Sequence, residues 1–251
     1  MQSINSPIKI GIIGAGQNTQ KVHIPKFREI PNAEILEVAN RTPESTREVA
    51  EKFNIPNPRN SWQEVAASKE TDAVLIGTWP YLHCEATCKA LESGKHVLCE
   101  ARMAMDAQQA HTMLNAARSK PDLVAQLVPA PVTFAVDNLI MGLIDSNYLG
   151  DLLAVSLRAL PPAVLPPAGF VNYEATMHRG RDHKIGGYNV LGIGMWYESL
   201  LRWIGPATRV MANSRVFVNQ LRTPNGSLQS VQLPDHVDIV CDMACGARAH
   251  M

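Results

Sequence analysis

Three short stretches of the sequence combine residue types and spacings that could do chemistry. Residues 11–19 are GIIGAGQNT, residues 40–42 are NRT, and residues 96–105 are HVLCEARMAM. In the first stretch, Gly14 and Gly16 stand between an Ile-rich run and a helical pattern. Gly14 permits a tight turn, and Gly16 lets the backbone approach a pyrophosphate that the next helix N-terminus would hold. This predicts a dinucleotide site, with cofactor contacts from Gly14, Gly16, Gln17 and Asn18.

The second stretch bears on which dinucleotide is bound. A residue roughly 20 positions beyond the glycines normally contacts the ribose, and an Asp or Glu there selects NAD. Here that place holds Asn40 and Arg41, so a 2′-phosphate would meet no carboxylate and could pair with Arg41. NADP is therefore favoured over NAD, which stays possible, and both residues are predicted cofactor contacts. The alternative is that Arg41 is an ordinary solvated loop residue.

The third stretch leaves a short buried strand through Glu100, Ala101 and Arg102. Ligands of an open parallel sheet sit just beyond the carboxyl ends of the strands, so a proton-transfer group is expected here. These three positions offer neither Lys nor His. Arg102 could anchor or polarise a substrate oxygen, but its guanidinium stays protonated and cannot act as a base.

These stretches lie in a first half in which strand and helix patterns alternate. Strands are predicted at 8–13, 33–39, 73–77, 95–99 and 123–128, and helices at 19–30, 43–53, 62–68, 81–92 and 106–119. Several of the strands are apolar on both faces, which is typical of a parallel sheet covered by helices on each side. We therefore predict a doubly wound α/β domain that binds NAD(P) over residues 1–128, followed by a second domain over residues 129–251.

Composition argues against several other classes of protein. Lys plus Arg equals Asp plus Glu at 23 each, which disfavours binding to nucleic acid or to a membrane surface. Apolar runs fall short of the roughly 20 residues of a membrane span, and the N-terminus lacks signal-peptide features, so the expected compartment is the cytoplasm. The five cysteines are too few and too irregularly spaced for a disulfide framework, and we expect no metal site.

Several motifs in sequence order resemble one known family. The glycine loop, Asn40-Arg41, IGTWPYLH (76–83), GKHVLCE (94–100) and GGYNVLGIGMWYE (186–198) together are similar to the Gfo/Idh/MocA family of nicotinamide-dependent oxidoreductases. The resemblance spans nearly the whole chain. It implies a Rossmann domain followed by an α/β domain with a large, mostly antiparallel open sheet. It also implies hydride transfer between the nicotinamide and a small molecule, typically a sugar or polyol.

The resemblance assigns roles to individual residues of the first domain. Thr78, Pro80 and His83 fall where the family lines the nicotinamide-ribose region, and Glu100 begins the family's Glu-Lys-Pro motif. Apart from the resemblance, Trp79 and Trp196 could form an aromatic wall on the pocket, although core packing is the commoner fate of Trp.

The family's proton-handling positions hold other residues in this chain. The Lys of the Glu-Lys-Pro motif falls on Ala101, and the family's Asp and His in the second domain fall on Gly192 and Trp196. Two explanations remain: an enzyme with relocated catalytic groups, or a nucleotide-binding sensor or partner protein that no longer turns over. For the enzyme, Arg102 would anchor substrate, and His183 or Tyr188 would transfer the proton. The alternative is that His183 lies in a solvated loop whose charged residues have no catalytic role.

The second half predicts helices at 132–146 and 188–203 and strands at 151–159, 208–218, 227–231 and 236–244. Family members usually continue beyond this point, so the resemblance implies an incomplete second sheet. An uncovered strand near a chain end leaves unpaired edge groups. The resemblance implies that such an edge is covered when two open sheets pack face to face, so we expect a homodimer or larger homo-oligomer.

Overall fold

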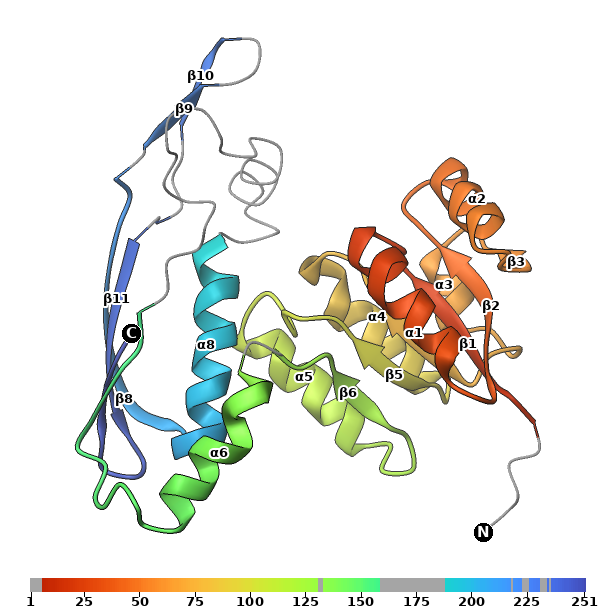
Figure 1. Ribbon diagram of the computed structural model, residues 1–251. Helices are drawn as coiled ribbons and strands as arrows, with labels where there is room; N and C mark the ends of the chain where they lie inside the picture. Colours follow the sequence, from red (N-terminus) through yellow and green to blue (C-terminus); the bar gives the residue numbers. More distant parts are fainter. Residues whose placement is uncertain are drawn as a thin grey trace. The chain divides into compact units, whose positions relative to one another are not determined.

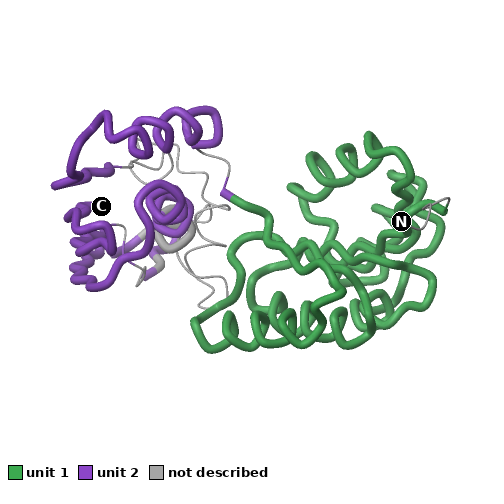
Figure 2. Tube along the Cα trace, turned by 90° about the horizontal axis from the view of Figure 1, so that it is seen from below, with its two compact units in different colours: residues 1–129 green, residues 130–251 purple. Residues whose placement is uncertain are grey.

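The computed structural model describes residues 6–130, 133–158, 188–217, 219–222, 226–230, 234 and 236–251. The chain divides into two compact units, residues 1–129 and 130–251 (Figure 2). Each unit is described by itself below.

The first unit is built on a parallel sheet of six strands. The strand order is β3-β2-β1-β4-β5-β6, so the connections reverse direction between β1 and β4. Strands β1 and β4 form the centre, and Ile12 of β1 lies beside Val38 of β2 and Leu75 of β4. The strands are β1 (Ile8–Ile13), β2 (Ala33–Ala39), β3 (Asn57–Pro58), β4 (Ala73–Ile76), β5 (His96–Cys99) and β6 (Ala125–Leu127).

Helices cover both faces of this sheet, as Figure 1 shows. One apolar core packs β1 and β2 against α1 (Ile24–Glu29) and α2 (Pro43–Lys52), with Ile12 and Ile24 fully buried. The other core packs β4 and β5 against α3 (Trp62–Ala66), α4 (Pro80–Glu92) and α5 (Ala107–Arg118). Side chains of Thr42, Ser61 and Asp106 accept backbone hydrogen bonds at the starts of α2, α3 and α5, as good N-caps do.

In its described part, the second unit pairs a four-stranded sheet of order β7-β12-β11-β8 with two helices. Strand β11 is antiparallel to β8 and β12, and β7 is parallel to β12. Leu200 and Ile204 of α8 pack against Cys241 and Met243 of β11. The elements are α6 (Phe134–Asp145), β7 (Ala154–Ser156), α8 (Tyr188–Ile204), β8 (Ala207–Arg215), β11 (His236–Met243) and β12 (Arg248–His250), with a separate hairpin of β9 (Gln220–Arg222) and β10 (Leu228–Ser230).

The predicted fold class is confirmed: a doubly wound parallel sheet is followed by a smaller, mostly antiparallel one. Strands β3 and β12, which are two and three residues long, were not predicted. The strand predicted to run to residue 218 ends at Arg215, and β9 forms the hairpin partner of β10.

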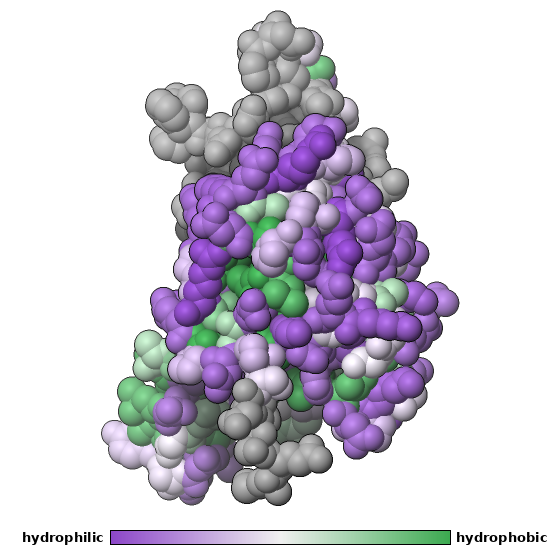
Figure 3. All heavy atoms as spheres, turned by 90° about the vertical axis from the view of Figure 1, so that its right-hand side faces the viewer, coloured by the Kyte–Doolittle hydropathy of each residue, from purple (hydrophilic) through white to green (hydrophobic). Residues whose placement is uncertain are grey.

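The face drawn in Figure 3 is mostly hydrophilic, and its apolar side chains gather in small areas rather than one broad patch. Across the described parts of the chain, every helix is too short or too polar to cross a membrane.

Candidate functional site

The glycine loop after β1 has little room at its first glycine and open space at its second. Gly14 has a φ of +84°, and a Cβ there would lie 2.6 Å from Cγ2 of Thr78 and 2.9 Å from its backbone N. A Cβ on Gly16 would meet no atom within 4 Å. Gly14 is therefore needed for the turn and for close approach to β4, whereas Gly16 leaves space above the loop.

Thr19 occupies the position where a dinucleotide-binding loop normally has a third Gly or Ala for close helix–strand packing. Its side chain is buried, and its hydroxyl donates to the carbonyl of Gly14 at 3.1 Å. Space for it comes from Gly77 at the end of β4, where a Cβ would lie 2.2 Å from Oγ1 of Thr19. Gly77, just after β4, therefore leaves the space that the larger side chain of Thr19 needs.

Asn40, at the end of β2, braces the glycine loop. Its Oδ1 accepts a hydrogen bond from the backbone N–H of Ala15 at 2.7 Å, and its Nδ2 donates to the carbonyl of Ser45 at 3.1 Å. Because both ends of its amide make these hydrogen bonds, the side chain of Asn40 holds the glycine loop in place and is not free to bind a ribose. Its neighbour Arg41 is exposed and has no hydrogen-bond or ion-pair partner among the described residues.

The loop leaves backbone donors for an anion. The first N–H groups of a helix have no partner within the helix. Ala15 N is taken by Asn40, but the N–H groups of residues 16–18 bond to no group in the described part of the chain. These donors and the empty space above Gly16 fit a pyrophosphate, which would also gain from the positive end of the helix.

Glu100, just beyond β5, is tied to the helix that follows the glycine loop. Its Oε1 lies 2.5 Å from Nε2 of His23 and also accepts from the amide of Asn18, and its Oε2 accepts from Ala101 N at 3.1 Å. The side chains of His23 and Glu100 are 12% and 16% exposed, so solvent and ligands can reach them. Burial opposes ionisation of Glu100, but His23 and the other donors hold its pKa below the ordinary value.

His83 was predicted to line the cofactor pocket, and this stays a prediction. The residue is fully buried on α4, with Nδ1 2.7 Å from the carbonyl of Arg102 and Nε2 3.0 Å from that of Thr78. Burial lowers its pKa despite the two carbonyls, which favour the charged form. With no exposed atom, His83 joins the two loops that carry Thr78 and Arg102.

The other predicted site residues of the first unit differ in their exposure. Trp79 is 42% exposed at the start of α4, and Pro80 is buried in the first turn. Gln17 and Ala101 are exposed, and Arg102 is half-buried. His183 lies outside the described residues, and Tyr188 is described only as the first backbone position of α8, so the structure brings neither to the site.

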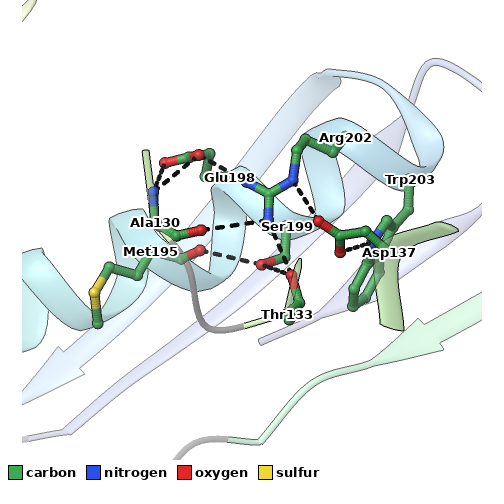
Figure 4. Close-up of polar contacts among 8 residues, drawn as sticks. All are labelled: Ala130, Thr133, Asp137, Met195, Glu198, Ser199, Arg202 and Trp203. Atoms are coloured by element: carbon green, nitrogen blue, oxygen red, sulfur yellow. Dashed lines mark hydrogen bonds and ion pairs between the residues drawn. The ribbon is translucent and has the colours of Figure 1, made fainter. Parts of the chain in front are cut away.

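The second unit contains a polar cluster around Arg202 (Figure 4). Its guanidinium donates to Asp137 at 3.0 Å, Glu198 at 2.7 Å and Thr133 at 2.9 Å, while Glu198 also accepts from Ala130 N. Burial opposes ionisation of Asp137, yet the bonds from Thr133, Trp203 and Arg202 keep its pKa below the ordinary value. The carboxylates of this cluster are paired with the guanidinium of Arg202 and the indole nitrogen of Trp203, so its role is to fasten α6 and the first residues of the unit to α8.

The residue that sequence reasoning undervalued is His23. On a regular α-helix its five-residue spacing from Asn18 puts the two side chains on different faces, so the pattern gave no reason to pair them with Glu100.

In the described parts of the chain no group of three or more His, Cys, Asp or Glu could hold a metal ion.

Comparison with known proteins agrees with this geometry. Residues 8–126 match the family model described as "Oxidoreductase family, NAD-binding Rossmann fold". The D-glucoside 3-dehydrogenase of Escherichia coli K12 is 30% identical over 172 residues, covering 68% of this chain and 48% of that protein. The chain spans about half to two thirds of the length of the curated relatives it matches.

Solved structures share the fold at low sequence identity. The WlbA dehydrogenase of Bordetella pertussis, in complex with NADH and UDP-GlcNAcA, has a TM-score of 0.79 at 18% identity, covering 98% of this chain and 66% of that one. A super-repressor mutant of Gal80p from Saccharomyces cerevisiae also has a TM-score of 0.79, at 14% identity, covering 98% and 67%. Through residues 8–126 the chain belongs to the Gfo/Idh/MocA family of oxidoreductases with an NAD-binding Rossmann fold.

Proposed function

We propose that this protein is an NAD(P)-dependent oxidoreductase that transfers hydride between a nicotinamide cofactor and a sugar- or polyol-like alcohol or ketone. The observation that carries the proposal is the geometry of the glycine loop. Gly14 makes the tight turn, and beyond it lie the open space above Gly16 and the N–H groups of residues 16–18, which have no partner among the described residues. When bound, the nicotinamide supplies or accepts the hydride, while the protein binds, orients and handles protons.

The chain's own residues divide this work. Gly14, Gly16, Gln17 and Asn18 would surround the pyrophosphate, Thr78 and Trp79 would border the nicotinamide half, and Glu100 would face it from β5. Arg102 would anchor a substrate oxygen, since a guanidinium binds but does not accept a proton. His183 and Tyr188 stay proposed proton-transfer groups from the second unit.

The substrate class follows from relatives. The Escherichia coli relative acts on a glucoside by its name, and the Bordetella pertussis structure holds a nucleotide sugar acid. The exposed ring of Trp79 beside the loop also suits the apolar face of a sugar. We extend the sugar-like substrate to this chain on that basis. The cytoplasmic location and the homodimer or larger homo-oligomer stay proposals that rest on the sequence and on the family resemblance.

The preference for NADP rests on Arg41 and has a matched test. Arg41→Ala should weaken NADPH binding about tenfold and leave NADH binding unchanged, because only NADPH carries the 2′-phosphate that a guanidinium would bind. Arg47→Ala is the control, since Arg47 is also exposed, lies in α2 six residues after Arg41, and among the described residues pairs with Glu44 at 3.5 Å. Equal losses for both nucleotides would remove Arg41 from the assignment.

A second function has its own support in the sequence. Ala101, Gly192 and Trp196 stand where the family handles protons, and the fold also occurs in a repressor protein. A protein of this kind would bind a nicotinamide dinucleotide as a sensor or partner without turning it over. Saturable NADH binding with no absorbance change at 340 nm across a panel of sugars and polyols favours this alternative, whereas turnover of any of them excludes it.

A further inference from the structure

We propose, on the basis of the function proposed above, that His23 held by Glu100 exchanges the substrate's proton in place of the lysine that Ala101 replaces. The pair is a built site in the first unit: a carboxylate oxygen 2.5 Å from an imidazole nitrogen, both partly accessible, at the carboxyl edge of the sheet.

A π-helical turn creates this pair. Residues Thr19–His23 form η1, which ends with the N–H of Ile24 bonded to the carbonyl of Thr19, five residues back. In such a turn, residues five apart lie over one another, whereas in an α-helix those three or four apart do. Asn18 and His23 therefore share a face, with Nδ2 of Asn18 3.5 Å from Nε2 of His23, and both reach Glu100. Single π turns occur frequently at functional sites.

The strand order places the pair on the nicotinamide side. A dinucleotide lies across the point where the strand order reverses, here between β1 and β4, with its adenosine ribose at the end of β2. The other half of the cofactor must then extend over the ends of β4 and β5. Glu100 directly follows β5, and its hydrogen bonds hold His23 at the same edge.

The hydrogen-bond pattern fixes how the imidazole can act. A carboxylate only accepts, so Nε2 of His23 carries the proton shared with Glu100, and Nδ1 is left as the acceptor. Nδ1 has no partner among the described residues. In oxidation of an alcohol, the C–H bond gives its hydride to the oxidised nicotinamide, the O–H proton passes to Nδ1, and a C=O bond forms. Reduction runs the same transfers backwards.

Other charged and titratable groups of the first unit lie on the elements that carry or adjoin the pair. Arg102 follows on the same loop, Lys21 and Lys26 are exposed on the helix of His23, and the ring of Phe27 lies 6.4 Å from the imidazole. On α4, His83 interacts electrostatically with Glu100, and burial lowers the pKa of His83, which favours its neutral form near pH 7. A charge that appears on His23 would therefore act on a nearby nicotinamide largely unopposed except by Glu100.

The test uses charge rather than turnover, because oxidised and reduced nicotinamide differ by one positive charge. The affinities of the full chain for NAD⁺ and NADH are measured by titration between pH 8 and pH 5.5. Protonation of His23 should raise the ratio Kd(NAD⁺)/Kd(NADH) roughly three- to tenfold as the pH falls, from the repulsion of two unit charges several ångströms apart. His23→Gln should abolish this pH dependence.

Two further variants keep the test decisive. His236→Gln breaks another His–carboxylate pair, 3.0 Å from Asp238 in the second unit, and should behave like the unsubstituted chain. Glu100→Gln removes a negative charge and should raise the same ratio about three- to tenfold at pH 8. A ratio that stays flat with pH, or that follows pH equally in His23→Gln, overturns the role of His23. Failure of both nucleotides to bind would instead overturn the proposed function itself.

Discussion

Gly14 and Gly16 are two residues apart, but only the surroundings and the backbone of Gly14 require a glycine. Gly14 has a positive φ and lies against Thr78, whereas Gly16 has neither constraint. We expect Gly14→Ala to lower the free energy of unfolding by about 1–3 kcal/mol, because it adds both backbone strain and a clash. Chemical denaturation of the two single variants checks this, with Gly16→Ala as the control that should unfold like the parent chain.

Gly77 is predicted to be as intolerant as Gly14, although its φ is not in the left-handed region. A Cβ there would lie 2.2 Å from Oγ1 of Thr19 and 2.6 Å from the carbonyl of Gly14. Gly77→Ala should cost about 1–3 kcal/mol of stability, as overpacking of a tight site usually does. An unchanged denaturation midpoint would show that Thr19 and the loop can shift freely.

Glu100 makes the stability of the first unit depend on pH. Its folded pKa lies below its ordinary value of 4.5, so its carboxylate stabilises the folded state above that value, and the contribution is lost as the pH falls through the folded pKa. The difference in unfolding free energy between the parent chain and Glu100→Gln should therefore be largest near pH 6 and shrink below pH 4.5. A difference that grows with acidity contradicts the depressed pKa.

At the scale of elements, the sequence predicted the strands and helices that carry strong patterns. The Ile-rich run of β1 and the apolar runs of β4 and β5 have a clear signal, because both faces of these strands are buried. Strand β3 contains Pro58 and spans two residues, so it offered no pattern. The π turn could not be predicted, because residue types do not reveal one extra residue in a helical turn. Since this turn brings His23 to Glu100, the pairing of these two residues could not be predicted either.

A buried carboxylate couples β2 to the loop after β3. Glu37 has no exposed surface, and its Oε1 lies 2.5 Å from the guanidinium of Arg59 and accepts from Ser68 at 2.7 Å. Glu37→Ala should destabilise the first unit by about 3–5 kcal/mol, because it leaves a half-buried guanidinium without its main partner. Glu70→Ala removes the exposed partner of the same Arg59 and should cost less than about 1 kcal/mol by denaturant unfolding.

The Arg202 cluster holds the second unit together in the same way. Arg202→Met should lower the thermal midpoint of that unit by more than about 5 °C, since Asp137 and Glu198 lose their shared cation. Arg209→Met is the matched control, because Arg209 is largely exposed beside Asp242 and should shift the midpoint by less than about 2 °C. Similar shifts for both variants would mean that the cluster adds no more than a surface pair.

At the scale of the whole molecule, the two units differ in how far chemistry can be assigned. The first unit carries the family match and a cradle whose donors, space and strand order all suit a dinucleotide. The second contributes a sheet and a braced pair of helices, while the segment with His183 lies outside the described residues. His23 and Glu100, which a single unit positions, are therefore the proton-handling pair that we propose, and the roles of His183 and Tyr188 stay predictions from the sequence.

The central claim is that the space above Gly16 receives the cofactor pyrophosphate, and Gly16→Ala tests it most directly. The added methyl meets no protein atom within 4 Å, so the variant should fold and unfold like the parent chain. In a fluorescence titration with NADH and NADPH, the parent chain should bind at least one of them saturably, and Gly16→Ala should bind it about tenfold or more weakly. Equal affinity in the two proteins, or no binding by the parent chain, would contradict a dinucleotide site at this loop.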